Sequence, residues 1–262
     1  MAACCRETTT MDELSGRTAL ITGVSGAIGA RIAATLGERG AHVIGTYRTG
    51  KSAAERAVAA IPAERRSLLR TEFGGAESAR ELWREASHIR DVDTVVVNAA
   101  VIEPTPLVGD SAAWDAGWQA TLDVNVVAAT TLMREAAATF AGRGFGSIIV
   151  ISSWAGQQGS RLAELGAYAA SKAAIRNFAQ TVARAYARDG VRVYTIAPGV
   201  VDAGMGTADK SPDEIQAVAD GLTMGQHVAA QEIAELAAFL ATDRAPSLTG
   251  STLDLNGASY VR

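Results

Sequence analysis

The chain has 262 residues, of which 48% are hydrophobic and 20% charged, and its formal net charge is -4 at pH 7. This length and apolar content suffice for one large core and argue against disorder. No run of Lys or Arg stands out, so we expect no nucleic-acid partner and no anionic membrane surface as a partner. No apolar run approaches the ~20 residues that a membrane span needs.

Residues 1–13 are expected to form a flexible lead, and they lack the apolar segment of a secretory signal. Cys4 and Cys5 are the only cysteines of the chain. Adjacent cysteines do not staple a fold, so we expect a reducing, cytoplasmic compartment. A reactive pair or half of a metal site is the alternative, but no partner lies nearby in the sequence, and we expect no metal site.

Short β-branched runs alternate with longer amphipathic segments through residues 14–262. Expected strands cover 18–21, 41–46, 67–70, 94–97, 147–151, 191–196 and 251–255. Expected helices cover 27–39, 52–60, 78–87, 112–141, 168–187 and 231–241. This alternation predicts an α/β fold with one doubly wound parallel sheet of the Rossmann type in a single domain.

A glycine-rich turn, 22–29, connects the first expected strand to the first expected helix. Glycines let the backbone approach a pyrophosphate closely, and the helix behind them offers free N–H groups. The turn therefore predicts dinucleotide binding, with an ordinary strand–helix turn as the alternative. The residues expected to contact the cofactor here are Gly23, Ser25, Gly26, Ile28 and Gly29.

The end of the second expected strand bears on the choice of cofactor. NAD-binding proteins usually carry an acidic residue there, for the ribose 2′-hydroxyl. This strand instead ends in Tyr47-Arg48, and no carboxylate precedes Glu55. Arg48 can pair with a 2′-phosphate, and Lys51 adds positive charge, so we expect NADP(H). A solvated arginine in a loop is the alternative.

Tyr168 and Lys172 lie four residues apart and would share one face of a helix. A nearby ammonium lowers the pKa of a phenol, which could then exchange a proton with a substrate oxygen. Ser152 and Ser153 end a buried strand, where Rossmann folds bind ligands. Surface residues for Tyr168 and Lys172, and a loop cap for the serines, are the alternatives.

Taken in order, these motifs resemble those of short-chain dehydrogenases/reductases, from about Leu14 to Gly257. The matching elements are Thr22-Gly23 with Gly29, Asn98-Ala99-Ala100, Asn125, Ser153, Tyr168 with Lys172, and Pro198-Gly199. The resemblance implies that Ser153 is catalytic, Tyr168 is the acid/base, Lys172 activates Tyr168, and Asn125 supports a proton-relay water.

The resemblance also implies further cofactor contacts. Asn98, Ala99 and Ala100 would lie beside the adenosine, and Glu72 and Phe73 around the adenine, although a plain turn is the alternative for that pair. Pro198, Gly199 and Val201, together with Tyr168 and Lys172, would lie at the nicotinamide end.

Several positions depart from the family pattern. Ala27 and Ala100 replace glycines, Tyr194 replaces an asparagine, and Ala203 replaces a threonine that often contacts the carboxamide. The interval from Ser153 to Tyr168 is also longer than usual. We expect the extra residues, 157–166, to shape the pocket rim.

Substrate choice is expected to depend on a mobile lid over about 203–226, with apolar contacts from Met205, Leu222 and Met224. Trp154 and Leu162 would line the opposite wall, although Trp154 is equally compatible with a core position.

The resulting expectation is an NADP(H)-dependent oxidoreductase that reduces a ketone to an alcohol, similar to 3-oxoacyl-thioester reductases. One alternative is an NAD(P)-dependent dehydrogenase working oxidatively, or a related dehydratase or epimerase step. The other is a non-enzymatic NADP sensor or scaffold. Family resemblance implies a small carbonyl or alcohol as the substrate and assembly as a homotetramer or homodimer.

Overall fold

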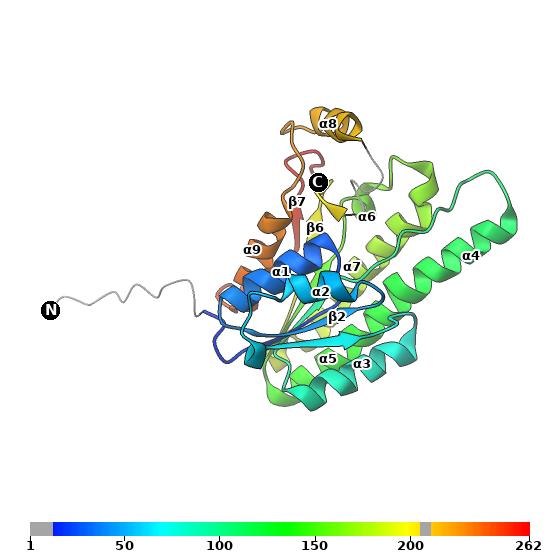
Figure 1. Cartoon of the computed structure of the whole chain (residues 1–262). Helices are drawn as coiled ribbons and strands as arrows, with labels where there is room; N and C mark the ends of the chain where they lie inside the picture. Colours follow the sequence, from blue (N-terminus) through cyan, green and yellow to red (C-terminus); the bar gives the residue numbers. More distant parts are fainter. Residues whose placement is uncertain (1–12, 205–210) are drawn as a thin grey trace.

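The computed structural model describes residues 13–204 and 211–262 (Figure 1). Its strands are β1 Thr18–Ile21, β2 His42–Tyr47, β3 Arg66–Arg70, β4 Thr94–Val97, β5 Gly146–Ile151, β6 Val191–Pro198 and β7 Thr252–Leu255. Its α-helices are α1 Ala27–Glu38, α2 Lys51–Ala57, α3 Ala76–Ile89, α4 Ser111–Leu122, α5 Ala129–Arg143, α6 Ala155–Gln158, α7 Gly166–Tyr186, α8 Pro212–Asp220 and α9 Ala230–Ala241.

The strands form one parallel sheet in the order β3-β2-β1-β4-β5-β6-β7. The direction in which strands are added reverses between β1 and β4: β2 and β3 extend the sheet on one side of β1, and β4 to β7 extend it on the other side. Crossovers at such a point diverge and leave a crevice at the carboxyl ends of the strands. The predicted doubly wound fold is therefore confirmed, and it places a ligand site between β1 and β4.

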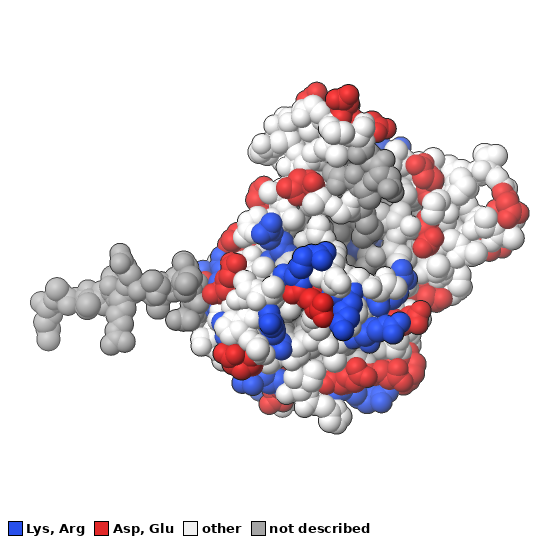
Figure 2. Space-filling model, in the orientation of Figure 1, with Lys and Arg blue, Asp and Glu red and all other residues white. Residues whose placement is uncertain are grey.

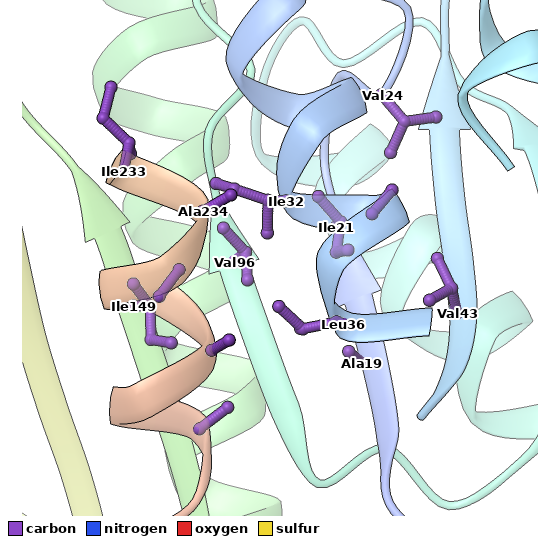
Figure 3. Packing of buried hydrophobic residues seen from close by; sticks show 14 of the residues in the cluster. Ala19, Ile21, Val24, Ile32, Leu36, Val43, Val96, Ile149, Ile233 and Ala234 are labelled. Atoms are coloured by element: carbon purple, nitrogen blue, oxygen red, sulfur yellow. The ribbon is translucent and has the colours of Figure 1, made fainter. Parts of the chain in front are cut away.

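Alternating strand residues face two separate hydrophobic cores, because successive side chains of a strand point to opposite faces of the sheet. Ile21, Val96 and Ile149 belong to the core under α1 and α9, where Ile32 and Ile233 pack on them (Figure 3). Their sequence neighbours belong to the second core, with residues of α3, α5 and α7. Burial of each large aliphatic side chain contributes about 2 kcal/mol. Helices on both faces thus hold the sheet rigid beneath the crevice.

The expected long helix over 112–141 is interrupted. A π-helical turn over Asp123–Ala128 separates α4 from α5. π-turns are often found at functional sites. This turn contains Asn125.

Helix α8 was not predicted, since 203–226 was read as a lid without regular structure. Ser211 caps α8 by accepting from the Glu214 backbone N–H, and the Glu214 carboxylate accepts from the Ser211 backbone in return. Pro212 follows in the first turn, where proline is well tolerated. The capping residues and the proline are local signals of a helix start, so the sequence carries the information for α8.

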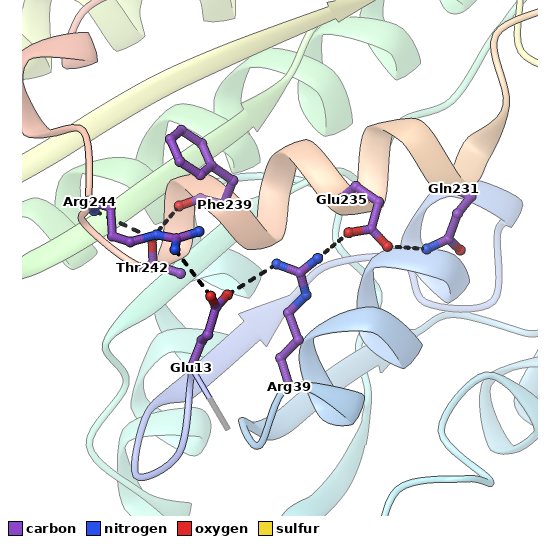
Figure 4. Close-up of polar contacts among 7 residues, drawn as sticks. All are labelled: Glu13, Arg39, Gln231, Glu235, Phe239, Thr242 and Arg244. Carbon is purple, nitrogen blue, oxygen red and sulfur yellow. Dashed lines mark hydrogen bonds and ion pairs between the residues drawn. The ribbon is translucent and has the colours of Figure 1, made fainter. Parts of the chain in front are cut away.

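A network of ion pairs and hydrogen bonds connects Glu13, at the start of the described chain, to α1 and α9 (Figure 4). Arg39, just after α1, contacts Glu13 at 3.4 Å and also pairs with Glu235 of α9. Arg244 contacts Glu13 at 3.2 Å. The network links α1 to α9, two helices of one layer that are far apart in sequence.

No helix in the described part of the chain is long and apolar enough to cross a membrane. Within those same residues, no three His, Cys, Asp or Glu side chains gather into a metal-binding group. Cys4, Cys5 and nearly all of the expected N-terminal lead lie outside the described residues, as does Met205.

Candidate active site

A cavity of about 750 Å³ opens at the carboxyl edge of the sheet. Most of the residues expected to bind cofactor or substrate line it. These are Gly23, Ser25, Gly26, Ile28, Gly29, Tyr47, Arg48, Phe73, Asn98, Ala99, Ala100, Ser153, Tyr168, Gly199 and Val201. Four expected residues do not line it, namely Glu72, Asn125, Lys172 and Pro198.

The glycine turn is built for close backbone approach. Gly23 adopts φ +76°, a left-handed conformation that favours glycine. A Cβ on Gly29 would lie 2.3 Å from the Gly23 carbonyl oxygen and 2.7 Å from Asn98 Nδ2. The N-terminus of α1 therefore approaches the turn without a side chain between them, as a cradle for a pyrophosphate requires.

Asn98 braces this turn from the neighbouring strand. Its side-chain amide donates to the Thr22 carbonyl at 2.8 Å. The Thr22 hydroxyl in turn accepts from the backbone N–H groups of Asn98 and Ala99, both at 2.9 Å. Asn98 thus fixes the shape of the glycine turn besides lining the cavity.

Arg48 is exposed at the end of β2 and lines the cavity. Its guanidinium has no hydrogen bond or ion pair with any residue that the structure describes, so it is available to a ligand. Phe73 is buried and lines the same end, whereas Glu72 is exposed and does not. The residues present fit a dinucleotide with an additional phosphate, and they give Glu72 no visible part in holding it.

Lys172 is fixed between α7 and the end of β5. Its ammonium donates to the Ile151 carbonyl at 2.9 Å, and the Ser152 hydroxyl donates to the Lys172 carbonyl at 2.9 Å. The Lys172 nitrogen lies 5.7 Å from the centre of the Tyr168 ring. Ser152 therefore braces α7 against the end of β5.

Burial shifts the pKa values of both Lys172 and Tyr168. It lowers the pKa of Lys172 to about 8 and raises the pKa of Tyr168, while a hydrogen bond with Ser153 opposes the shift at Tyr168. The expectation that the pKa of Tyr168 is lowered is therefore wrong, because burial disfavours the charged phenolate more than the hydrogen bond with Ser153 favours it. Tyr168 is a neutral phenol at neutral pH and can donate a proton.

Asn125 lies behind the cavity and is 1% exposed. Its amide oxygen accepts from the Val101 N–H at 2.8 Å, and its nitrogen donates to the Val101 carbonyl at 2.9 Å and to the Ser171 hydroxyl at 3.1 Å. The Ser171 hydroxyl donates to the Tyr168 carbonyl at 2.7 Å. The π-turn thus connects the loop after β4 to the backbone of the helix that carries Tyr168.

Two positions that sequence reasoning missed hold the same helix. The buried Thr105 hydroxyl accepts from the Ala167 N–H at 3.2 Å, and Thr105 also binds the Glu164 carbonyl. A Cβ on Gly156 would lie 2.8 Å from the Ala173 nitrogen, so α6 can pack directly on α7. No local pattern reveals either contact, because each joins segments that are distant in sequence.

The remaining cavity wall comes from α8 and from the loop before α7. Val218 of α8 and Leu222, just after α8, line it. Trp154, just before α6, and Leu162, from the loop before α7, also line it, as expected. Figure 1 shows α8 above the carboxyl edge of the sheet. Met224 is 61% exposed and does not line the cavity.

The residues before and after the segment that carries α8 are hydrogen-bonded to each other. Val201 and Val228 form a parallel bridge, and the Val228 N–H donates to the Val200 carbonyl at 2.9 Å. The two ends of the expected lid therefore meet beside β6.

Comparison with known proteins agrees with this geometry. A family model described as enoyl-(acyl carrier protein) reductase matches residues 23–257. The 3-oxoacyl-(acyl-carrier-protein) reductase FabG of Escherichia coli (strain K12) is 32% identical over 246 residues, 94% of this chain and 98% of that protein. The cis-4-hydroxycyclohexanecarboxylate dehydrogenase of Sinomonas cyclohexanicum is 31% identical over 244 residues, 92% of this chain and 95% of that protein.

Solved structures give the same result. A 3-oxoacyl (acyl-carrier-protein) reductase from Agrobacterium tumefaciens C58 with NADP bound has a TM-score of 0.85 and 30% identity, with 97% of both chains covered. A structure described as a short chain dehydrogenase/reductase family protein has a TM-score of 0.80 and 32% identity, covering 94% of this chain and 97% of that one. The chain belongs to the short-chain dehydrogenase/reductase family, which confirms the resemblance. It is an enzyme of the oxidoreductase class.

Proposed function

We propose that this enzyme uses NADP(H) to reduce a ketone or other carbonyl compound to an alcohol. The observation that carries the proposal is the convergence of Ser153, Tyr168 and Lys172 at the carboxyl edge of the sheet, beside the glycine cradle. The relatives named as 3-oxoacyl reductases and the NADP-bound structure support the same activity and cofactor.

Each residue has a distinct part in the proposed reaction. The glycine turn would hold the pyrophosphate and Arg48 the 2′-phosphate, and the bound cofactor supplies the hydride. The Ser153 hydroxyl would hydrogen-bond the carbonyl oxygen of the substrate and stabilise its developing charge. Tyr168, protonated at neutral pH, would give that oxygen its proton. Asn125 would position α7 and a proton-relay water.

Oxidation of a secondary alcohol by the same groups is the second candidate. The relative named as a hydroxycyclohexanecarboxylate dehydrogenase favours it. The raised pKa of Tyr168 favours reduction, since a protonated phenol is ready to donate and not to accept. A non-enzymatic sensor has less support, because the whole catalytic set is present. A cytoplasmic location and a homotetramer or homodimer complete the proposal.

The first test replaces Tyr168 by Phe. We expect turnover of 3-oxoacyl thioesters or aliphatic ketones with NADPH to fall by about 10²- to 10⁴-fold, the usual contribution of general acid catalysis. NADPH affinity, followed by nicotinamide fluorescence, should stay within about threefold, because the phenol contributes little to cofactor affinity. Tyr186→Phe, on the same helix, is the matched control and should keep full turnover. Retained turnover in Tyr168→Phe would remove Tyr168 from its role.

The second test concerns Arg48. In Arg48→Gln we expect the Kd for NADPH to rise about 10- to 100-fold, since a charge-assisted bond to phosphate is lost, and the Kd for NADH to change little. Arg56→Gln, an exposed arginine at the far end of α2, controls for the loss of one positive charge. Equal affinity for NADPH and NADH in the unaltered enzyme would contradict the assignment of Arg48.

A further inference from the structure

The charged side chains that line the cavity, among the residues that the structure describes, are all cationic. Among the described residues that line the cavity, Arg48 and Arg161 carry charge and no carboxylate is present. Arg48 lies at the end of β2, where the proposed function places the cofactor phosphate. Arg161 belongs to the loop between α6 and α7, on the substrate side. The proposed function gives Arg161 no role.

Arg161 contacts the aromatic ring of Trp154. Its guanidinium carbon lies 5.6 Å from the centre of the Trp154 ring, and Trp154 directly follows Ser153. A cation–π contact orients the guanidinium and leaves the N–H groups at its edge free to donate. Within 13–204 and 211–262, that guanidinium forms no ion pair and no hydrogen bond. It is therefore both oriented and available.

The wall between Arg161 and Tyr168 is apolar. Leu162 and Leu165 contribute to it from the loop before α7, Val218 from α8 and Leu222 from the turn just after α8. Such a wall suits a hydrocarbon skeleton whose carbonyl end reaches Ser153 and Tyr168. Because Arg161 is exposed at the substrate end of the cavity, the far end of that skeleton would meet a cation there, and a charge-assisted bond from a guanidinium is stronger than a bond between neutral groups.

We propose that Arg161 binds an anionic group on the substrate, a carboxylate or a phosphate, and so makes the enzyme selective for carbonyl compounds with a negatively charged end. This inference depends on the proposed function only for the placement of the substrate carbonyl at Ser153 and Tyr168. The anion site is a separate claim, and it can be measured without turnover.

Binding provides the first test. Hexanoate and hexylphosphonate are titrated calorimetrically into the NADPH-loaded enzyme, with hexanamide as the neutral counterpart. We expect both anions to bind at least tenfold more tightly than the amide, and this preference to disappear in Arg161→Gln. Whichever of the two anions binds more tightly identifies the anionic group of the natural substrate as a carboxylate or a phosphate. Arg84→Gln, an exposed arginine on α3, is the matched control and should bind as the unaltered enzyme does.

Turnover provides the second test. For 4-oxopentanoate, 5-oxohexanoate and 6-oxoheptanoate, Arg161→Gln should lower kcat/KM by about 10- to 100-fold, mainly through KM. For the methyl esters of the same acids it should change kcat/KM by less than about twofold. Arg161→Lys should recover part of the preference, because it keeps the charge and loses the two-pronged geometry.

The outcomes separate this inference from the proposed function. Anion binding that depends on Arg161 in an enzyme that reduces no ketone would leave the anion site intact and refute the reductase. Ketone reduction with no preference for acids over esters, or an equal loss for both in Arg161→Gln, would overturn the anion site. Loss of cofactor affinity in Arg161→Gln would also overturn it, since Arg161 would then belong to the cofactor end.

Discussion

Lys172 is a basic residue that is buried in the folded protein. Its side chain is 3% exposed, its ammonium donates to one carbonyl oxygen, and burial lowers its pKa from 10.5 to about 8. The charged form is therefore disfavoured in the folded state. Such a position costs stability, and proteins keep it where the group serves a purpose.

The shift at Lys172 predicts a pH-dependent stability. Between pH 8 and 10.5 the unfolded chain holds the Lys172 proton and the folded chain does not, so stability rises with pH in that interval. Relative to Lys172→Met, the free energy of unfolding of the unaltered protein should increase by about 3 kcal/mol across this window, at 1.36 kcal/mol per pKa unit. Urea unfolding at several pH values measures the difference.

The control for this experiment is Lys51→Met, at an exposed lysine whose side chain is 69% accessible. Its stability curve should run parallel to that of the unaltered protein. A parallel curve for Lys172→Met as well would show that Lys172 keeps an ordinary pKa in the folded chain.

At the scale of elements, α7 is the part whose placement decides the site, because it carries both Tyr168 and Lys172. Three contacts from elsewhere hold its first turns: Thr105 at its start, Gly156 against its side, and Asn125 through Ser171. Tyr168 follows Ala167 directly, so the bond from the Ala167 N–H to Thr105 fixes the backbone one residue before the phenol.

Thr105→Val tests this placement. The change keeps the shape and leaves the Ala167 N–H at the helix start without its acceptor, so we expect a loss of about 1–2 kcal/mol in the free energy of unfolding. We also expect kcat to fall about tenfold, since small displacements of catalytic groups are costly. NADPH affinity should be unchanged.

Thr105→Ser restores the hydroxyl and should recover both stability and kcat. A valine variant with lower stability and full kcat would show that Thr105 supports the fold without positioning Tyr168.

At the scale of the whole molecule, the cavity has two ends with different origins. The cofactor end is built from the ends of β1, β2 and β4, on a sheet buried on both faces. The substrate end is built from α8 and the loop before α7, at the outer margin of the fold (Figure 1). Basic side chains gather over α1 and α2 on the face toward the viewer in Figure 2. That charge suits the approach of an anionic cofactor.

Much of the site could be predicted from sequence because its parts follow strands directly. The glycine turn follows β1, Arg48 follows β2, Asn98 follows β4 and Ser153 follows β5. In a parallel sheet these positions meet at one edge. Glu72 also follows a strand, β3, but it is exposed and does not line the cavity. The order of the strands does not determine which side chains of the loop after a strand face the cavity.

The sequence by itself determined the fold class, the family and the chemical identity of the groups at the sheet edge, because periodicity and local turn chemistry encode them. The tertiary structure decided what depends on contacts between distant segments. It placed Thr105 and Gly156 against α7, opened the π-turn at Asn125 and set Arg161 beside Trp154. It also decided that burial raises the pKa of Tyr168, because desolvation depends on everything that surrounds a group and not on its neighbours in the chain.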